Sequence, residues 1–210
     1  GIPQTPMLTE DHPLQPINPY GESKRMVEWA LAAMGRADGL RWMALRYFNV
    51  AGADPKGRSG QSTPRATHLI KVACQTALGQ RQSMDIFGTD YDTPDGTCLR
   101  DYIHVSDLIA AHMDALSHLR RGGESGVFNC GYGTGYSVLE VISAVEKAHG
   151  GPIKANRVAR RAGDPAGHVQ RLEDRHLVAQ LGQVGRAGEP CGAGADHRDL
   201  AAGGLGGRHG

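Results

Sequence analysis

A tyrosine and a lysine four residues apart are the residues of this sequence whose types and spacing first suggest chemistry. Tyr20 and Lys24 belong to the segment Tyr-Gly-Glu-Ser-Lys, and at this spacing two side chains share one face of a helix. A free phenol has a pKa of about 10 and is a poor base near neutral pH, but a nearby ammonium group stabilises the phenolate. The pair could therefore exchange a proton with a substrate hydroxyl group. Such pairs also occur by chance on exposed helices. The surrounding sequence therefore has to show whether this pair is functional.

The elements that must position this pair alternate between helix and strand. One apolar stripe predicts a helix over residues 20–34, ended by Gly35 and Gly39; its members are Met26, Val27, Ala30, Leu31 and Met34. Further helices are expected over 66–78, from 106 onward and from 138 to 149. Strands are expected over 41–49, largely buried on both faces, and over 83–87, 99–105, 126–130 and 152–158. This alternation predicts an α/β fold with parallel strand pairing.

Two helix starts have recognisable sequence signals. Ser106 or Asp107 is the expected N-cap of the third helix, whose apolar face would comprise Leu108, Ile109, His112, Met113 and Leu116. Ser137 and Glu140 have the spacing of a capping box, and the helix that follows them should end at Gly150. Residues 1–19 contain five prolines and are expected to form a loop.

Composition excludes several classes of protein. Of the 210 residues, 40% are hydrophobic and 21% are charged, which is typical of a soluble globular chain. No apolar run is long enough for a membrane span, and a net charge of +1 gives no argument for nucleic acid or a membrane surface. The four cysteines include no Cys-x-x-Cys pair, so we expect reduced thiols in a cytoplasmic protein and no metal site.

The end of the chain differs from the rest. Residues 167–210 contain eleven glycines and no Phe, Trp, Tyr, Ile or Met. Such a segment buries too little apolar surface to offset its ordering entropy, about 1–2 kcal/mol per residue. We expect this Gly-rich tail to be either disordered or an out-of-frame translation, and we favour the second.

Four segments carry a family resemblance. Pro16 to Lys24 has the sequence PINPYGESK and Arg46 to Ala53 has RYFNVAGA; together they resemble the extended short-chain dehydrogenase/reductase family. Asp85 to Val105 (DIFGTDYDTPDGTCLRDYIHV) and Arg160 to Asp164 (RRAGD) are similar to the UDP-glucose 4-epimerases within it. The resemblance is expected to cover residues 1 to about 166.

The resemblance implies an activity and a set of site residues. It implies reversible hydride transfer between NAD and C4 of a UDP-hexose through a 4-keto sugar, with Tyr20 as the catalytic acid/base and Lys24 as its partner and ribose ligand. Phe48 would contact the cofactor with them. The substrate contacts implied by the resemblance are Asn49, His68, Leu69, Asp85, Ile86, Phe87, Arg100, Tyr102, Arg161 and Asp164. Arginine forks suit a diphosphate, and Phe87 can lie against a uracil face.

The resemblance also implies an organisation. Residues 1–64 would be the remnant of an NAD-binding domain, and 65–166 a substrate domain with elements returning to the main sheet. The fold would thus be the C-terminal part of a doubly wound, Rossmann-type parallel-sheet domain interleaved with a smaller α/β domain. A cytoplasmic homodimer with a UDP-sugar substrate is implied for the full-length enzyme.

Some features depart from the family pattern. His68 stands where many members carry Asn, and a tyrosine expected shortly after Asp164 is missing. The Gly-rich loop that cradles the pyrophosphate and the Ser/Thr of the catalytic triad are also missing, and we expect both to precede Gly1 in a longer protein. The chain alone should then bind NAD poorly and turn over little. The alternatives are another nucleotide-sugar epimerase or dehydratase, or a non-catalytic fragment that binds UDP weakly or dimerises through its first helix.

Overall fold

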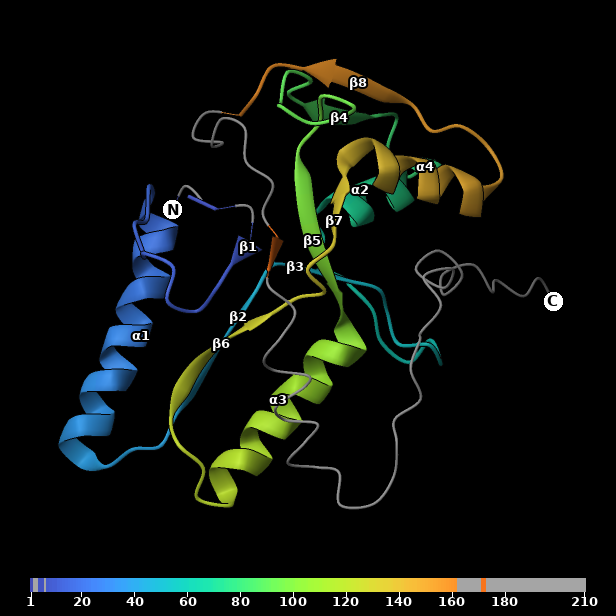
Figure 1. Cartoon of the computed structure of the whole chain (residues 1–210). Helices are drawn as coiled ribbons and strands as arrows, with labels where there is room; N and C mark the ends of the chain where they lie inside the picture. The colour runs from blue at the N-terminus through green and yellow to red at the C-terminus, as the bar shows by residue number, and fades with distance from the viewer. Residues whose placement is uncertain (2–3, 6, 162–170, 173–210) are drawn as a thin grey trace.

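The computed structural model describes residues 1, 4–5, 7–161 and 171–172. Helices and strands alternate along most of this length (Figure 1). None of the helices in these described ranges is long and apolar enough to cross a membrane. In chain order the elements are β1 (Met7–Leu8), α1 (Pro19–Asp38), β2 (Met43–Tyr47), β3 (Asn49–Ala51), α2 (Leu69–Ala77), β4 (Met84–Phe87), β5 (Leu99–His104), α3 (Val105–Arg120), β6 (Gly126–Cys130), β7 (Gly135–Ser137), α4 (Val138–His149), β8 (Ala155–Val158) and β9 (Arg171–Leu172).

Strand pairing is mostly parallel, which confirms the predicted α/β class. β2 pairs with β6, β3 with β5, β4 with β8 and β1 with β9, all in parallel. The exception is β7, which pairs antiparallel with β5 so that Leu99 lies opposite Ser137. The sequence analysis missed β1 and β7 because they are only two and three residues long, too short to show alternation. The predictions for residues 167–210 lie outside the described residues, apart from the two that form β9.

The strand predicted over 41–49 is in fact two strands with different partners. β2 ends at Tyr47, opposite Cys130 of β6, and β3 begins at Asn49, opposite Tyr102 of β5. Phe48 lies at the point where the chain changes partner. The expectation of burial on both faces is wrong, because β2 is half-buried and Tyr47 is exposed. Within the described residues β2 pairs with β6 alone, so its second edge is open.

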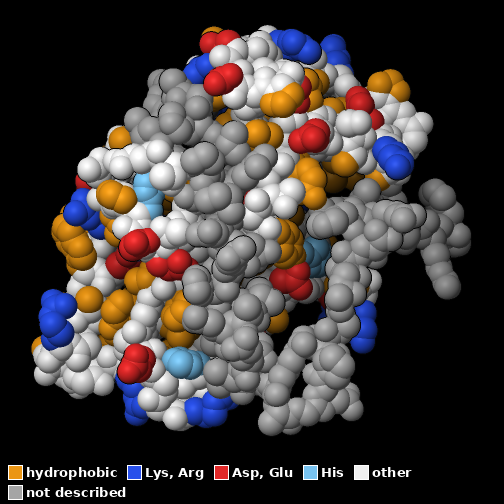
Figure 2. Space-filling view, in the orientation of Figure 1, with side chains coloured by type: hydrophobic (Ala, Val, Ile, Leu, Met, Phe, Trp, Pro, Cys, Tyr) orange, Lys and Arg blue, Asp and Glu red, His pale blue; other side chains and the backbone are white. Residues whose placement is uncertain are grey.

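Helix α1 is longer and more exposed than its sequence suggests. It begins after Asn18, whose side chain accepts a hydrogen bond from the Gly21 backbone N–H at 2.8 Å. It runs through Gly35 and ends before Gly39, which adopts the left-handed conformation with φ 67°. No residue of α1 is buried in the described structure, and Met26 is 61% exposed. Hydrophobic side chains accordingly lie at the surface over α1, on the left of Figure 2.

The start of α3 differs from the prediction. The helix begins at Val105, and its N-cap is His104, whose Nδ1 accepts a hydrogen bond from the Ser106 backbone N–H at 3.1 Å. Neither Ser106 nor Asp107 caps the helix. An imidazole is an unusual N-cap acceptor, whereas serine and aspartate are common ones. The prediction therefore placed the start of α3 too late in the sequence.

The buried face of α3 shares only Leu108 with the apolar face predicted from the sequence. Leu108, Ala111 and Ala115 are buried, whereas Ile109 and Met113 are exposed by more than half. The two alanines have short side chains that let the helix approach the strands closely. A count of large apolar residues overlooks such a face.

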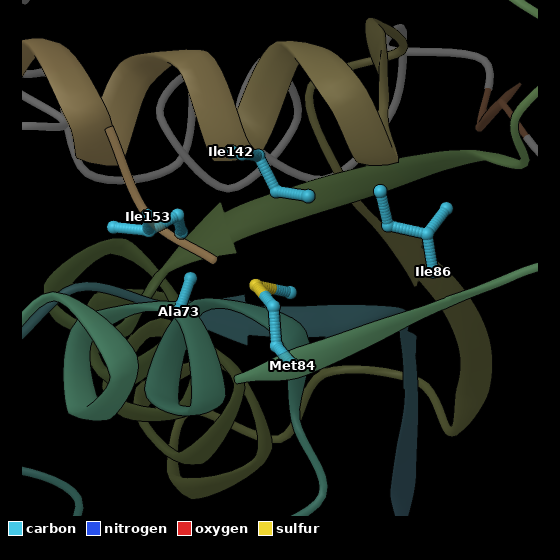
Figure 3. Close-up of a cluster of buried hydrophobic side chains, with 5 residues drawn as sticks. All are labelled: Ala73, Met84, Ile86, Ile142 and Ile153. Atoms are coloured by element: carbon cyan, nitrogen blue, oxygen red, sulfur yellow. The ribbon is translucent and has the colours of Figure 1, made fainter. Parts of the chain in front are cut away.

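Two clusters of buried apolar side chains hold the elements together. One joins β5, α3 and β6 through Ile103, Leu108, Ala111 and Cys130. The other joins α2, β4, α4 and the segment before β8, and its members converge in Figure 3: Ala73, Met84, Ile86, Ile142 and Ile153. The predicted capping box at Ser137 and Glu140 is confirmed, and Gly150 ends α4 in the left-handed conformation. These contacts fix β4 and β5, which carry half of the candidate substrate residues.

Candidate functional site

Tyr20 and Lys24 lie together in the first turns of α1. The Lys24 ammonium is 5.2 Å from the centroid of the Tyr20 ring, and Tyr20 is 72% exposed. A surface hollow of about 570 Å³ adjoins this end of the helix; it is lined by Pro16, Ile17, Asn18, Pro19, Glu22, Ser23 and Met26. The phenol and the ammonium are therefore both close to one another and open to a ligand.

One strand links this helix to the rest of the fold. Arg46 of β2 forms an ion pair with Glu28 of α1 and donates a hydrogen bond to the Glu10 carbonyl oxygen. The Glu10 side chain in turn accepts from the Asn129 backbone N–H of β6 at 2.9 Å. Sequence reasoning placed Arg46 in a family segment but gave it no role, because its partners are distant in sequence.

A second group of candidate residues lies where β3 meets β5. The Asn49 side-chain amide donates to the Asp101 carbonyl oxygen at 3.1 Å, and Asn49 stands opposite Tyr102. Burial raises the pKa of Tyr102 to about 12, so this phenol stays protonated. Arg100 is half-buried, and its Nη1 donates to the Leu99 carbonyl oxygen at 3.1 Å. Asn49 and Arg100 are half-buried and carry donors for a polar ligand, whereas Tyr102 is only 7% exposed.

The Asp101 carboxylate, which the sequence analysis did not single out, stabilises this region. Asp101 is fully buried and accepts backbone hydrogen bonds from Tyr132 at 3.2 Å and from Gly133 at 2.9 Å. It thereby fastens the β6–β7 connection to the strand that carries Arg100 and Tyr102. Its only sequence signal is its place between those two residues.

A third group lies on β4 and next to β8. The Arg161 guanidinium carbon is 3.9 Å from the centroid of the Phe87 ring. Arg161 therefore covers one face of that ring. The Asp85 carboxylate accepts from the Asn156 side-chain amide at 3.2 Å. Ile86 is 4% exposed and belongs to the core, so only its backbone could contact a ligand.

His68 and Leu69 stand at the start of α2. His68 occupies the N-cap position, but its side chain makes no capping hydrogen bond; instead its Nδ1 lies 2.7 Å from Gln61 Nε2. Leu69 is half-buried against the cluster drawn in Figure 3. His68 is the member of this pair whose side chain is exposed to a ligand.

The structure thus places the candidate residues in separate groups. Helix α1, which carries Tyr20 and Lys24, lies at one side of the molecule, whereas β4 and β8 lie at the end where β5 begins (Figure 1). Phe48 and Asn49 lie between them in sequence and mark the change of strand partner. Asp164 lies outside the described residues. No three His, Cys, Asp or Glu side chains gather as a metal site within the described part of the chain.

Known proteins match this chain over most of its length. The family model described as "NAD dependent epimerase/dehydratase family" matches residues 1–131. The UDP-glucose 4-epimerase of Azospirillum brasilense is 62% identical over 184 residues, which are 88% of this chain and 52% of the relative. That of Halalkalibacterium halodurans is 49% identical over 178 residues, 85% of this chain and 53% of the relative.

Solved structures agree. The UDP-glucose 4-epimerase from Brucella ovis in complex with NAD superposes with a TM-score of 0.82 at 41% identity, covering 87% of this chain and 55% of that one. The enzyme from Bifidobacterium longum in complex with NAD⁺ and UDP gives 0.83 at 37% identity, covering 97% of this chain and 58% of that one.

These matches correct the expected end of the resemblance and show the family to which the chain belongs. The Azospirillum match covers more of the chain than residues 1–166 make up, so the expected end of the resemblance near 166 is too early. The chain spans about half the length of the curated relatives it matches. Since the family model covers more than half of the chain and close relatives cover most of it, this chain belongs to the NAD dependent epimerase/dehydratase family.

Proposed function

We propose that this chain serves NAD-dependent epimerisation at C4 of a UDP-hexose such as UDP-glucose or UDP-galactose. The observation that carries the proposal is the Tyr20–Lys24 pair, with its ammonium 5.2 Å from the ring centroid on an exposed helix start. The relatives named above are UDP-glucose 4-epimerases, and two solved relatives are described with NAD, one of them also with UDP. Those names support the choice of substrate and cofactor.

The proton chemistry falls to α1. Tyr20 Oη would take the proton of the C4 hydroxyl and later return one to the same oxygen, while the Lys24 ammonium stabilises the phenolate between the two events. The exposed Tyr20 hydroxyl and the Lys24 ammonium are hydrogen-bond donors suited to a nicotinamide ribose. Together with Phe48, these two residues would hold the cofactor. NAD, when bound, supplies a hydride acceptor and donor.

The nucleotide would be held by the other groups. Arg161 carries a planar fork suited to a diphosphate, and among the described residues it forms no ion pair that would compete. Phe87 would contact the uracil, with Asp85 and the backbone of Ile86 beside it. Arg100, Asn49 and the protonated Tyr102 would bind phosphate or sugar hydroxyls from β3 and β5, with His68 and Leu69 next to them at the start of α2.

The test uses the full chain and a chimera. The chain is assayed with UDP-galactose and NAD, first by itself. It is then assayed as a chimera, in which it replaces the matching segment of the Azospirillum brasilense enzyme. We expect UDP-glucose from the chimera and a loss of about 10² to 10⁴-fold in kcat with Tyr20→Phe, as for removal of a general acid/base. Met34→Leu on the same helix is the matched control and should leave the rate unchanged.

Other outcomes would point elsewhere. A 4-keto-6-deoxy product would indicate a dehydratase, and activity on UDP-uronates alone would indicate a uronate epimerase. A correctly folded chimera with no turnover of any nucleotide sugar would contradict the proposal and leave a binding fragment.

We further propose a homodimer in the cytoplasm. The exposed apolar residues of α1, among them Met26, Val27 and Trp29, support a contact between two copies of this helix. Light scattering of the chimera should give twice the mass of one copy, and Val27→Lys in the chimera should give a monomer. A monomer for the unaltered chimera would contradict this part of the proposal.

A further inference from the structure

Two neighbouring arginines each lie against a different aromatic ring. The guanidinium carbon of Arg160 is 4.1 Å from the centroid of Tyr91, and that of Arg161 is 3.9 Å from the centroid of Phe87. Both distances are in the range of cation–π contacts. The two adjacent arginine side chains therefore occupy different places at the end of the β4–β8 pair, one against Tyr91 and one against Phe87.

Arg160 is fixed by polar contacts as well. Its Nε donates to the Asp90 carboxylate at 2.7 Å, and its Nη2 donates to the Asp90 carbonyl oxygen at 2.6 Å. Two donors of one planar group bound to one residue set the orientation of that plane. The hydrogen bond from Arg160 also lowers the pKa of the Asp90 carboxyl below its ordinary value. The charge of Arg160 is thus already matched by a carboxylate.

The turn after β4 is shaped to receive this side chain. Gly88 has φ 77°, and a Cβ on it would lie 2.7 Å from Arg160 Cγ and 2.6 Å from Tyr91 Cε2. The Gly88 backbone N–H donates to the Val158 carbonyl oxygen at 2.9 Å, which continues the pairing of β4 with β8. Tyr91 is 6% exposed, so its ring is a fixed surface. Phe87 immediately precedes this turn, and Arg161 immediately follows Arg160.

We propose that Arg160 is a positioning residue that, by binding Asp90 and stacking on Tyr91, holds Arg161 against Phe87. The consequence for nucleotide binding rests on the proposed function, in which Arg161 and Phe87 hold the diphosphate and the uracil. With its own charge paired to Asp90, Arg160 leaves the anionic ligand to Arg161. Two consecutive arginines thus have different tasks, one structural and one for the ligand.

The test compares Arg160→Ala with Arg157→Ala in the full chain. Arg157 is an exposed arginine of β8 that lines the same surface hollow as Arg160, so it is a matched control for charge. The first measurement is the NMR shift of the Arg161 side-chain protons, which the Phe87 ring moves upfield; Phe87→Leu identifies these signals. The second is the affinity for UDP by calorimetry.

We expect Arg160→Ala to remove the upfield shift and to weaken UDP binding about tenfold, which is the loss of one well-placed interaction. Arg157→Ala should retain the shift and stay within about twofold in affinity. Asp90→Ala, on an exposed turn residue, should reproduce the effect of Arg160→Ala and replaces it if that variant does not fold.

Three results discriminate further. An unchanged Arg161 shift in Arg160→Ala and Asp90→Ala would overturn the positioning role. An unchanged shift with lost UDP affinity would overturn it in favour of direct ligand contact by Arg160. Loss of the shift in a chain whose unaltered form binds no UDP would support the positioning role and overturn the nucleotide site of the proposed function.

Discussion

The guanidinium of Arg46 in β2 donates two hydrogen bonds to the carboxylate of Glu28 in α1. The distance is 2.8 Å from Nε to Oε1 and 2.7 Å from Nη2 to Oε2. Both side chains are mostly covered, with 23% and 18% exposure. Glu28 follows Lys24 by one helical turn, so this ion pair sets where Tyr20 and Lys24 lie relative to the sheet. Since α1 buries no residue in the described structure, a polar contact has an unusually large share in docking it.

Removing one partner of this ion pair should destabilise the fold. We expect Arg46→Ala to lower the free energy of unfolding by about 2–3 kcal/mol, because Glu28 is left partly buried without its partner. Urea unfolding can be followed by the fluorescence of Trp29 and Trp42. The comparison is Arg58→Ala, which removes an arginine whose side chain is 71% exposed from its pair with Asp54 and should lower the urea midpoint less. Equal effects of the two substitutions would show that the Arg46–Glu28 pair contributes no more to stability than the Arg58–Asp54 pair.

The capping box of α4 should contribute more than the cap of α1. The Ser137 hydroxyl is buried, accepts from the Glu140 backbone N–H at 3.0 Å and donates to the Asp95 carboxylate. We expect Ser137→Ala to cost about 1–2 kcal/mol, the upper part of the range for N-caps. Asn18→Ala, at an exposed cap where water can replace the amide, should cost less, about 0.5 kcal/mol. Chemical unfolding of both variants gives the comparison, and the reverse order would contradict it.

Two glycines with the same backbone conformation should differ in their tolerance of a side chain. Gly96 has φ 75° and a Cβ there would lie 2.5 Å from the Thr89 carbonyl oxygen, whereas Gly79 has φ 70° and open space around it. We expect Gly79→Ala to cost about 1 kcal/mol from the left-handed backbone alone. Gly96→Ala should cost about 3 kcal/mol or more, because a backbone atom must also move. Similar midpoints in thermal unfolding would mean that the turn relaxes freely.

The buried thiol of Cys130 should make stability fall at high pH. Burial raises the pKa of Cys130 from 9.0 to about 12, so the fold favours the protonated thiol. Its contribution is complete below the unfolded value and is lost as the pH rises from about 9 to about 12. Unfolding free energies measured over this window should fall less steeply for Cys130→Ala than for the unaltered chain. Some slope should remain, because the pKa values of Tyr102 and Tyr132 are also raised to about 12.

Alkylation gives an independent measurement on the same residue. At pH 8, iodoacetamide should label native Cys130 at least about 100-fold more slowly than Cys130 in urea, because only the thiolate reacts. Mass spectrometry of the labelled peptide reports the rate. Equal rates in the native and unfolded chains would contradict the burial and the raised pKa.

The sequence by itself determined the features that depend on neighbouring residues. Hydrogen bonds of helix caps join residues about three apart, so Ser137 and Glu140 could be recognised from their spacing alone. The i, i+4 relation of Tyr20 and Lys24 likewise follows from helix geometry, and the strand–helix alternation predicted the fold class. Local patterns failed where the buried surface is made by small residues, as in α3, or where a strand is very short, as in β7.

Only the tertiary structure decided which distant residues meet. Arg46 pairs with Glu28, which is 18 positions away in the sequence, and Arg160 pairs with Asp90, which is 70 positions away. No local period encodes such pairs, because they form only after the strands have chosen their partners. The change of partner at Phe48, from β6 to β5, is of the same kind. Chain closure costs entropy that buried apolar clusters must offset, so the packing of the whole chain, and not any segment, selects these contacts.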